Sequence, residues 1–364
     1  MAPNLAPTER RPLTCVWEIT NACNLRCVHC EGSSGPRRRD ELSRDEALDV
    51  CDALAALGCE RCNLTGGEPL LRDDWPELAR RLSGHGIEVH LVTNGTRLDA
   101  AAVACAEQAG VSGVAVSLDG LRATHDRIRP AASGAHGSSF ALALDALERV
   151  VRSHMKAGVI THINAWNLGE LDALREQLAR LEVDVWQLQL AVPAGRLRAL
   201  AEPYLIAPAE LEQVYAFLLR TLADRRVPTR ITDTIGYFTE LEPVIRGRHS
   251  PESLPFWTGC QAGLQVVAID SNGDVKGCPS MPAEFVAGNL RQRSLADIWH
   301  DEEGFAYNTR WREQELTGFC RECAFRRLCR AGCTTYAYSV TGTIYQNPYC
   351  LHRVRALAQQ RSRP

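Results

Sequence analysis

Between residues 14 and 190 the chain alternates short β-type runs with helical patterns, and this alternation constrains the fold more than any other feature. The β-type runs are residues 13–19, 61–65, 87–92, 113–117, 157–163 and 185–190. Repeated strand–helix–strand units form parallel pairs with right-handed crossovers. Six such units are fewer than the eight that close a TIM barrel. We therefore expect an α/β fold, an open partial (β/α)6 TIM-type barrel with its chemistry on loops at the carboxyl ends of the strands.

Helical patterns lie between these runs, and one follows the last of them. They cover residues 45–57, 75–82, 100–109, 140–154, 171–181 and 203–225. Ser43 and Glu46 form a capping box before the first helix, and Gly58 ends it. From these patterns we expect four regions, namely an N-terminal tail (1–13), the partial barrel (14–225), a bridge without clear periodicity (226–258) and a cysteine-rich region (259–364).

The fifteen cysteines are clustered rather than scattered. Three are spaced CxxxCxxC in the loop after the first β-type run, namely Cys23, Cys27 and Cys30. The absence of a signal peptide or a membrane-spanning run predicts a cytoplasmic protein, whose thiols stay reduced and favour metal over disulfides. A formal net charge of −3 gives no reason to expect binding to nucleic acid or to an anionic membrane.

The triple-cysteine loop suits an iron–sulfur cluster with one open position. A [4Fe–4S] cluster has four irons, and cysteine thiolates are its usual ligands. Three thiolates therefore leave one iron open to a small molecule. The alternative for this loop is a zinc site that is completed by a fourth ligand from elsewhere in the chain. For the cysteines near the C-terminus, described below, the corresponding alternative is zinc knuckles built from CxxC pairs.

Four further motifs follow successive strands, and they carry a family resemblance. These are Thr65-Gly-Gly-Glu-Pro69, Thr93-Asn-Gly-Thr96, Ser117-Leu-Asp-Gly120 and His125-Asp-Arg-Ile-Arg129. Together with CxxxCxxC they resemble the radical S-adenosylmethionine (SAM) family, which has a GGEP motif. The resemblance implies that a [4Fe–4S] cluster on the triple-cysteine loop binds SAM and cleaves it reductively. The resulting 5′-deoxyadenosyl radical then abstracts a hydrogen atom from the substrate.

The same resemblance implies which residues contact SAM. They are His29, Gly66, Gly67, Glu68, Ser117 and Arg129. Glu68 suits the methionine ammonium group, and Arg129 with Ser117 suits the carboxylate end. His29 stands where the family usually has an aromatic residue beside adenine. We expect the two glycines to let the backbone approach this ligand without a Cβ clash.

Seven cysteines near the C-terminus form a second pattern. They are spaced Cys260-x12-Gly273-x4-Cys278, then Cys320-x2-Cys323-x5-Cys329-x3-Cys333, then Cys350. This pattern resembles the SPASM extension of radical SAM enzymes, which carries two auxiliary Fe–S clusters, expected here as [4Fe–4S]. The resemblance assigns Cys320, Cys323, Cys329 and Cys350 to one cluster. It assigns Cys260, Cys278 and Cys333 to the other, which lies nearer the barrel.

The segment around Cys278 supports two narrower predictions. Residues 266–278 are typical of a hairpin with its turn at 271–273. Residues 249–259 contain no cysteine, so the nearer auxiliary cluster either takes His249 as a ligand or has an open fourth site. Sulfatase-maturating relatives carry an acidic base directly after the cysteine that matches Cys278, and Pro279 here weighs against formylglycine formation.

Other cysteines and histidines are interpreted as structural. We expect packing for Cys51, Cys59, Cys62 and Cys105. His162 is interpreted as a strand residue rather than a ligand. Cys15 is a minor candidate for a hydrogen-atom donor near the barrel mouth. The sequence identifies no catalytic residue.

The resemblance implies an enzyme, an oxidoreductase or maturase. SPASM enzymes mainly modify ribosomally made peptides, so we expect a crosslink, an epimerisation or an oxidation of such a peptide. The alternative is a dehydrogenase or epimerase of a small molecule, such as an aminocyclitol or sugar in natural-product biosynthesis. Expected partners are an external reductant such as flavodoxin or ferredoxin and, because few residues precede the first strand, a separate leader-peptide-binding protein. An iron–sulfur electron carrier or zinc-stabilised binding module is disfavoured by the GGEP motif and Arg129.

Overall fold

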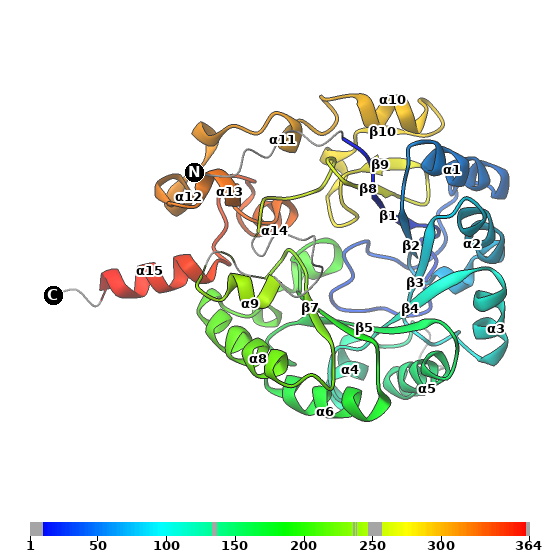
Figure 1. The fold of residues 1–364 in the computed structure, drawn as a ribbon, viewed down its shortest axis with the longest axis horizontal. Helices are drawn as coiled ribbons and strands as arrows, with labels where there is room; N and C mark the ends of the chain where they lie inside the picture. Colours follow the sequence, from blue (N-terminus) through cyan, green and yellow to red (C-terminus); the bar gives the residue numbers. More distant parts are fainter. Residues whose placement is uncertain (1–9, 133–136, 236, 238, 247–256, 362–364) are drawn as a thin grey trace.

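The computed structural model describes residues 10–132, 137–235, 237, 239–246 and 257–361 (Figure 1). These residues form a ten-stranded sheet in the order β10-β9-β8-β1-β2-β3-β4-β5-β6-β7. Its strands are β1 (Thr14–Glu18), β2 (Arg61–Thr65), β3 (Glu88–Thr93), β4 (Val111–Ser117), β5 (Lys156–Ile163), β6 (Val185–Leu190), β7 (Thr229–Ile231), β8 (Val266–Ile269), β9 (Asp274–Lys276) and β10 (Gly288–Asn289).

The six predicted strands are confirmed as β1 to β6, and each pairs in parallel with the next. A seventh parallel strand, β7, follows β6 and lies in the segment that we interpreted as a bridge. Its three residues are too few to show a periodicity in sequence. Figure 1 shows the sheet curving without closing, with the helices on its outer side.

The larger helices that follow the barrel strands agree with the helical patterns. They are α1 (Arg44–Ala56), α2 (Trp75–Gly84), α3 (Ala100–Gln108), α5 (Ser139–Val151), α6 (Leu171–Leu181) and α8 (Leu211–Ala223). The remaining ones are α4 (Arg122–Ile128), α7 (Ala201–Tyr204), α9 (Glu242–Arg246), α10 (Leu295–His300), α11 (Ala306–Thr309), α12 (Gly318–Glu322), α13 (Arg326–Cys329), α14 (Thr334–Thr341) and α15 (Leu351–Arg361). No helix among the described residues is long and apolar enough to cross a membrane.

Two helix boundaries illustrate how the local sequence sets where a helix begins. The capping box of Ser43 and Glu46 is confirmed at the start of α1. The helix predicted over 203–225 is wrong at its start, because α8 begins only at Leu211. Pro208 opens a short 3₁₀ turn before it, since proline fits a first turn but not a helix interior.

Alternating burial along the strands distinguishes the two faces of the open barrel. In β1, β2 and β6 every second residue is buried, and the others keep partial exposure. The buried set, which includes Trp17 and Trp186, packs beneath the helices in one hydrophobic core. A closed barrel fills its interior with packed side chains. Here the inner face of the sheet instead keeps accessible surface.

The predicted hairpin is confirmed, and it also extends the barrel sheet. β8 and β9 pair antiparallel around a turn in which Gly273 has φ of +89°. β8 pairs in parallel with β1, with Val266 opposite Thr14. The sequence did not predict this second pairing. It places Cys278, two residues after β9, close to the barrel.

Candidate functional site

The loop between β1 and α1 carries the first three predicted cluster ligands. These are Cys23, Cys27 and Cys30. The loop lies along the C-terminal end of α4, where the amide of Val28 donates to the carbonyl of Ile128 at 2.8 Å. This pairing brings Arg129 against the cysteines.

The environment of these thiols suits metal ligation. The amide of Leu25 donates to the Cys23 sulfur at 3.5 Å, and that of Ser34 donates to the Cys30 sulfur at 3.2 Å. Such bonds support thiolate charge and tune cluster potentials. Burial raises the pKa of Cys23 to about 12 and also raises that of Cys27. Thiols of this kind are thiolates at neutral pH only when a metal holds their charge.

Arg196, on the 3₁₀ helix η3 (Gly195–Ala199), also holds this loop. Its guanidinium donates to the carbonyl of Cys27 at 2.6 Å and to that of Ser34 at 2.7 Å. Its amide donates to the carbonyl of Cys30 at 3.0 Å. No motif in the sequence pointed to Arg196, because its contacts lie more than 150 positions away in the chain.

The seven C-terminal cysteines fall into two groups. The outer group surrounds Cys329, and its other members are Cys320, Cys323 and Cys350. The inner group surrounds Cys333, and its other members are Cys260 and Cys278. In each group burial raises the pKa of the central thiol, and the neighbouring thiols raise it further. This is the grouping that the SPASM resemblance implies, while the assignment of individual ligands stays a prediction.

The spacing of the sulfurs counts against zinc. Among the described residues, no three cysteine sulfurs lie within 4.8 Å of one another. A tetrahedral zinc ion with Zn–S bonds of about 2.3 Å brings its sulfurs to about 3.8 Å. The three cysteine sets are therefore spaced more widely than a single zinc ion requires.

The glycines of the GGEP motif serve a further purpose that the sequence did not reveal. A Cβ on Gly66 would lie 2.4 Å from the carbonyl oxygen of Thr20, and one on Gly67 would lie 2.3 Å from that of Ala22. The amide of Gly67 also donates to the Thr20 carbonyl at 2.7 Å. The missing side chains thus admit the backbone of the cysteine loop itself. Contact of either glycine with SAM stays a prediction.

Glu68 is fully buried and its carboxylate is held in one orientation. One oxygen accepts from the Thr93 hydroxyl at 2.7 Å and from the amide of Leu70 at 3.3 Å. The other oxygen accepts from the amide of Asn94 at 2.8 Å. Burial raises the pKa of Glu68 to about 6, against these hydrogen bonds. The motif after β3 therefore positions the carboxylate of the motif after β2.

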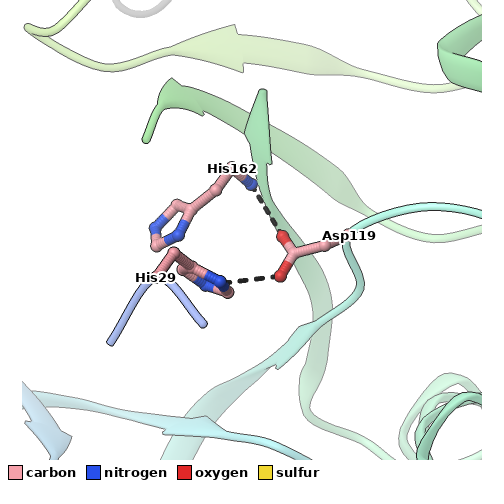
Figure 2. Close-up of side chains that lie close together, drawn as sticks. All are labelled: His29, Asp119 and His162. Atoms are coloured by element: carbon pink, nitrogen blue, oxygen red, sulfur yellow. Dashed lines mark hydrogen bonds and ion pairs between the residues drawn. The ribbon is translucent and has the colours of Figure 1, made fainter. Parts of the chain in front are cut away.

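Beside the cysteine loop, the structure gathers a buried polar cluster (Figure 2). Arg129 Nε lies 2.6 Å from Asp119 Oδ2, and its two terminal nitrogens lie 3.8 Å from the Cys27 sulfur and 3.2 Å from His29 Nε2. His29 Nε2 is 3.4 Å from Asp119 Oδ2. The amide of His162, on β5, donates to Asp119 Oδ1 at 2.8 Å. Ser117 is buried just before this cluster, at the end of β4.

The charges of this cluster favour an organic ligand over a metal ion. Burial would raise the pKa of Asp119, but Arg129 and the histidines lower it below its usual range. Burial lowers the pKa of His29 and takes that of His162 to about 4, so both rings are neutral. The ligand atoms of His29, Asp119 and His162 lie within 4.8 Å of one another. However, the guanidinium of Arg129 already neutralises the carboxylate of Asp119, which is the only charged ligand that this trio would offer a metal ion.

Three buried polar atoms here have no hydrogen-bond partner among the described residues. They are Nδ1 of His29, Nδ1 of His162 and the hydroxyl of Tyr204. The Tyr204 ring lies parallel to His29, with centroids 6.1 Å apart and an interplanar angle of 6°. Unpartnered buried polar atoms are rare and call for an unseen partner. Sequence reasoning missed His162 and Tyr204, because only folding brings them beside His29.

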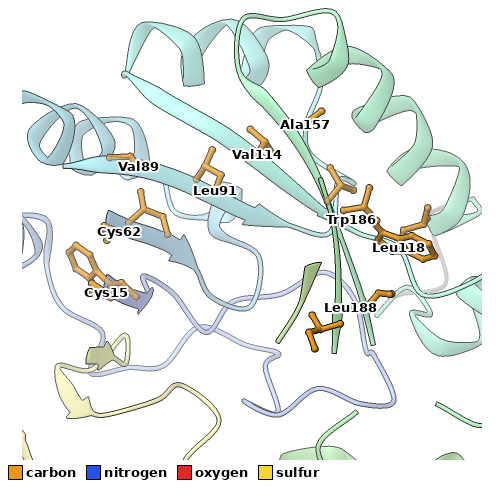
Figure 3. Packing of buried hydrophobic residues seen from close by; sticks show 14 of the residues in the cluster. Cys15, Cys62, Val89, Leu91, Val114, Leu118, Ala157, Trp186 and Leu188 are labelled. Atoms are coloured by element: carbon orange, nitrogen blue, oxygen red, sulfur yellow. The ribbon is translucent and has the colours of Figure 1, made fainter. Parts of the chain in front are cut away.

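Cys15 and Cys62 lie in the hydrophobic core (Figure 3). Cys15 pairs with Cys62 across β1 and β2, and both are fully buried under the helices. Cys15 therefore faces the helices, and its role as a hydrogen-atom donor is rejected. Packing in the same core is confirmed for Cys51, Cys59, Cys62 and Cys105. His249 lies outside the described residues.

Comparisons with known proteins agree with this site. Residues 17–178 match the family described as the Radical SAM superfamily, and residues 260–324 match the SPASM family, an iron–sulfur cluster-binding domain. The chain is 31% identical to the AdoMet-dependent heme synthase of Methanosarcina barkeri (strain Fusaro / DSM 804), over 94% of this chain and 97% of that protein. It is also 31% identical to the mycofactocin maturase MftC of Mycobacterium ulcerans (strain Agy99), over 97% of this chain and 92% of that protein.

Solved structures show the same fold at low sequence identity. Streptococcus suis SuiB bound to S-adenosylmethionine aligns with a TM-score of 0.72 at 15% identity, over 94% of this chain and 78% of that one. The protein anSMEcpe with bound AdoMet aligns with a TM-score of 0.71 at 18% identity, over 96% of this chain and 100% of that one. The chain is therefore an enzyme of the radical SAM superfamily with a C-terminal SPASM domain.

Proposed function

We propose that this enzyme modifies a ribosomally made peptide by removing a hydrogen atom from it. A [4Fe–4S] cluster and SAM, when bound, would supply the one-electron chemistry that breaks an unreactive C–H bond. The residues of the chain hold and orient these groups. Cys23, Cys27 and Cys30 ligate the cluster, and the two SPASM groups hold auxiliary clusters.

The polar residues beside the cysteine loop would orient SAM. Glu68, fixed by three donors, faces the ammonium group, and the guanidinium of Arg129 beside Cys27 binds the carboxylate. His29 and Tyr204 offer parallel ring faces and unpartnered polar atoms to the adenosine part. Their burial keeps water from the reacting groups.

The observation that carries the substrate class is a pair of carboxyls beside the inner group. Glu31, next to Cys30, is hydrogen-bonded by Ser280 and lies near Cys278, while Asp233 lies near Cys333. Desolvation raises the pKa of Glu31 to about 7 and that of Asp233 to about 6, although Glu31 is only half-buried and Asp233 keeps an exposed surface. Such carboxyls accept hydrogen bonds from amide or ammonium donors. They oppose a substrate rich in carboxylates.

This charge pattern supports one of two kinds of relative that differ in their chemistry. A heme synthase and a peptide maturase are equally similar to the chain in sequence identity. Tetrapyrroles carry carboxylate side chains, which Glu31 and Asp233 would repel in their ionised forms, whereas peptide amides would donate hydrogen bonds to these two carboxyls. An aminocyclitol or amino sugar is the second candidate, because its ammonium groups suit the same two carboxyls.

The test compares the three substrate classes under one assay. The reconstituted enzyme is incubated anaerobically with SAM, dithionite and either short peptides encoded beside its gene, iron coproporphyrin III or an aminocyclitol. We expect a peptide to stimulate 5′-deoxyadenosine formation and to change in mass, and we expect the Cys27→Ala variant to do neither. Stimulation by the porphyrin or the aminocyclitol alone would contradict the proposal.

A further inference from the structure

The outer group lies inside a positively charged part of the molecule. Residues 318–361 contain seven arginines and one glutamate, a net charge of +6, whereas the whole chain carries −3. His352 on α15 contacts Phe319 on α12 and Phe325 beside α13, with ring centroids 5.9 Å and 5.1 Å apart. The three helices therefore form one surface, which lies at one side of the molecule in Figure 1. We call it the basic face.

Several arginines of the basic face are not neutralised within the described part of the chain. Arg321 is exposed and donates to the carbonyl of Leu316 at 3.0 Å, and Arg361 is exposed at the end of α15. Arg326 and Arg327 share the single carboxylate of Glu313, whereas Arg355 is paired with both Glu212 and Glu240. The side chain of Arg327 is 79% exposed. Excess positive charge is thus presented to solvent.

A surface cavity connects the basic face to the outer group. Its volume is about 190 Å³, and its lining includes Cys320, Asn347 and Arg353. Asn347 is 2% exposed, and its side-chain nitrogen has no partner among the described residues. Burial raises the pKa of Cys320, while the Arg353 charge lowers it, so this guanidinium lies near the sulfur. A ligand of the outer group is therefore reached from the charged surface.

The three cysteine sets are arranged in series. Cys329 belongs to the outer group, and Cys333, only four residues later in the chain, belongs to the inner group. Glu31 affects the pKa of Cys278, which places the inner group beside the loop that carries Cys30. Clusters held by these sets would form a path from the surface to SAM.

We propose that the basic face docks an acidic one-electron carrier protein, so that electrons enter through the outer group. This inference rests on the proposed function, since the path conducts only when clusters occupy the three sets. The carrier is oxidised by one electron and the outer cluster is reduced by one, with no bond or proton involved. Opposite net charges attract over a long range and fix the docking orientation, and salt screens this attraction. A flavodoxin of strongly negative net charge is the probe that we choose.

The experiment removes three positive charges from the basic face. The test variant carries Arg321→Gln, Arg327→Gln and Arg361→Gln, and the matched control carries Arg80→Gln, Arg152→Gln and Arg180→Gln on exposed positions of the barrel helices. Calorimetric binding of oxidised flavodoxin is measured at about 20 mM and about 300 mM salt. We expect the test variant to bind about tenfold more weakly at low salt, and high salt to weaken native binding.

A second measurement separates this inference from the proposed function. Reduction of the enzyme by dithionite, a small chemical donor, should be equally fast in both variants, whereas reduction by the flavodoxin should slow only in the test variant. Equal flavodoxin binding by the test and control variants would overturn the docking surface and leave the proposed function standing. A failure of 5′-deoxyadenosine formation with dithionite would count against the proposed function instead.

Discussion

Gly67 shows how the absence of one side chain positions the cluster loop. Its Cα lies so close to the loop that a Cβ would meet the carbonyl oxygen of Ala22 at 2.3 Å. Backbone atoms on both sides leave no flexible group to move aside. The GGEP motif was recognisable in sequence, but its steric partner was not, because Ala22 precedes it by 45 positions. The sequence therefore identified the glycine of the motif but not the backbone contact that requires a glycine there.

A Gly67→Ala substitution should displace the cysteine loop. Because misplacement of reacting groups by about 1 Å can cost about 10²-fold in rate, we expect a loss of that order in SAM-dependent 5′-deoxyadenosine formation. Iron bound per chain should also fall. Gly84→Ala is the matched control, since a Cβ there meets nothing within 4 Å. Equal activity of the two variants would show that the clash is relieved without moving the loop.

His125 makes the stability of the site depend on pH. It is fully buried, its Nδ1 accepts from the amide of Asp119 at 3.1 Å, and burial lowers its pKa to about 4. An unfolded histidine has a pKa of about 6.5, so the unfolded state binds more protons between these values. This contribution to stability is present above pH of about 6.5 and is lost as the pH falls toward 4.

We expect the free energy of unfolding to fall by about 1.4 kcal/mol per pH unit over this range from His125 alone. A His125→Asn variant keeps an acceptor near the position of Nδ1 but does not titrate. Calorimetric melting temperatures of both proteins between pH 7 and pH 5 test this. The native protein should lose stability more steeply than the variant, and parallel curves would contradict the assignment.

Secondary-structure elements were predictable where their signals are local. The capping box at Ser43 and the turn glycine at position 273 mark an element end within a few residues, and both are confirmed. α4 and β7 escaped prediction, because seven and three residues show too little periodicity. Yet Arg129 caps the C-terminal end of α4, and the chain at this end holds the cysteine loop. Short elements thus control the site more than their sequence pattern suggests.

The 3₁₀ helix η3 offers a test of how one element supports another. Replacing Arg196 by glutamine removes two charged hydrogen bonds to the carbonyls of Cys27 and Ser34. Each such bond contributes about 1.5–3 kcal/mol. We expect the loop to loosen and the N-terminal cluster to lose iron to a chelator at least tenfold faster. Arg198→Gln, on the same helix but exposed, should leave the rate of iron loss unchanged. Equal rates of iron loss from the two variants would show that Arg196 does not stabilise the cysteine loop.

At the scale of the whole molecule, the SPASM region completes the barrel sheet. β8 covers the edge of β1, with Val267 opposite Cys15, and Val267 is fully buried. The two regions therefore share one sheet and one core. This pairing also holds the inner group near the cysteine loop, which the proposed electron path requires.

A chain that ends at residue 258 should not form a stable barrel. Removing β8 leaves β1 as an unpaired edge and uncovers apolar side chains, a combination that promotes aggregation. We expect insoluble material, or soluble aggregate by size-exclusion chromatography, under conditions where the full chain is monodisperse. A soluble, monodisperse truncated chain with native-like circular dichroism would show that the barrel folds without β8.

The sequence by itself determined the parallel barrel strands, the motif positions after each strand and the cysteine spacings, because these signals repeat or lie within a few residues. Only the tertiary structure decided that Arg129 joins Asp119 beside Cys27, that Tyr204 lies over His29 and that Glu31 meets Ser280. These partners are far apart in the chain, and parallel crossovers bring the strand ends to one edge, so their contacts exist only once the sheet has formed. The charge around the outer group was present in the sequence, but its concentration on one face depended on the packing of α12, α13 and α15.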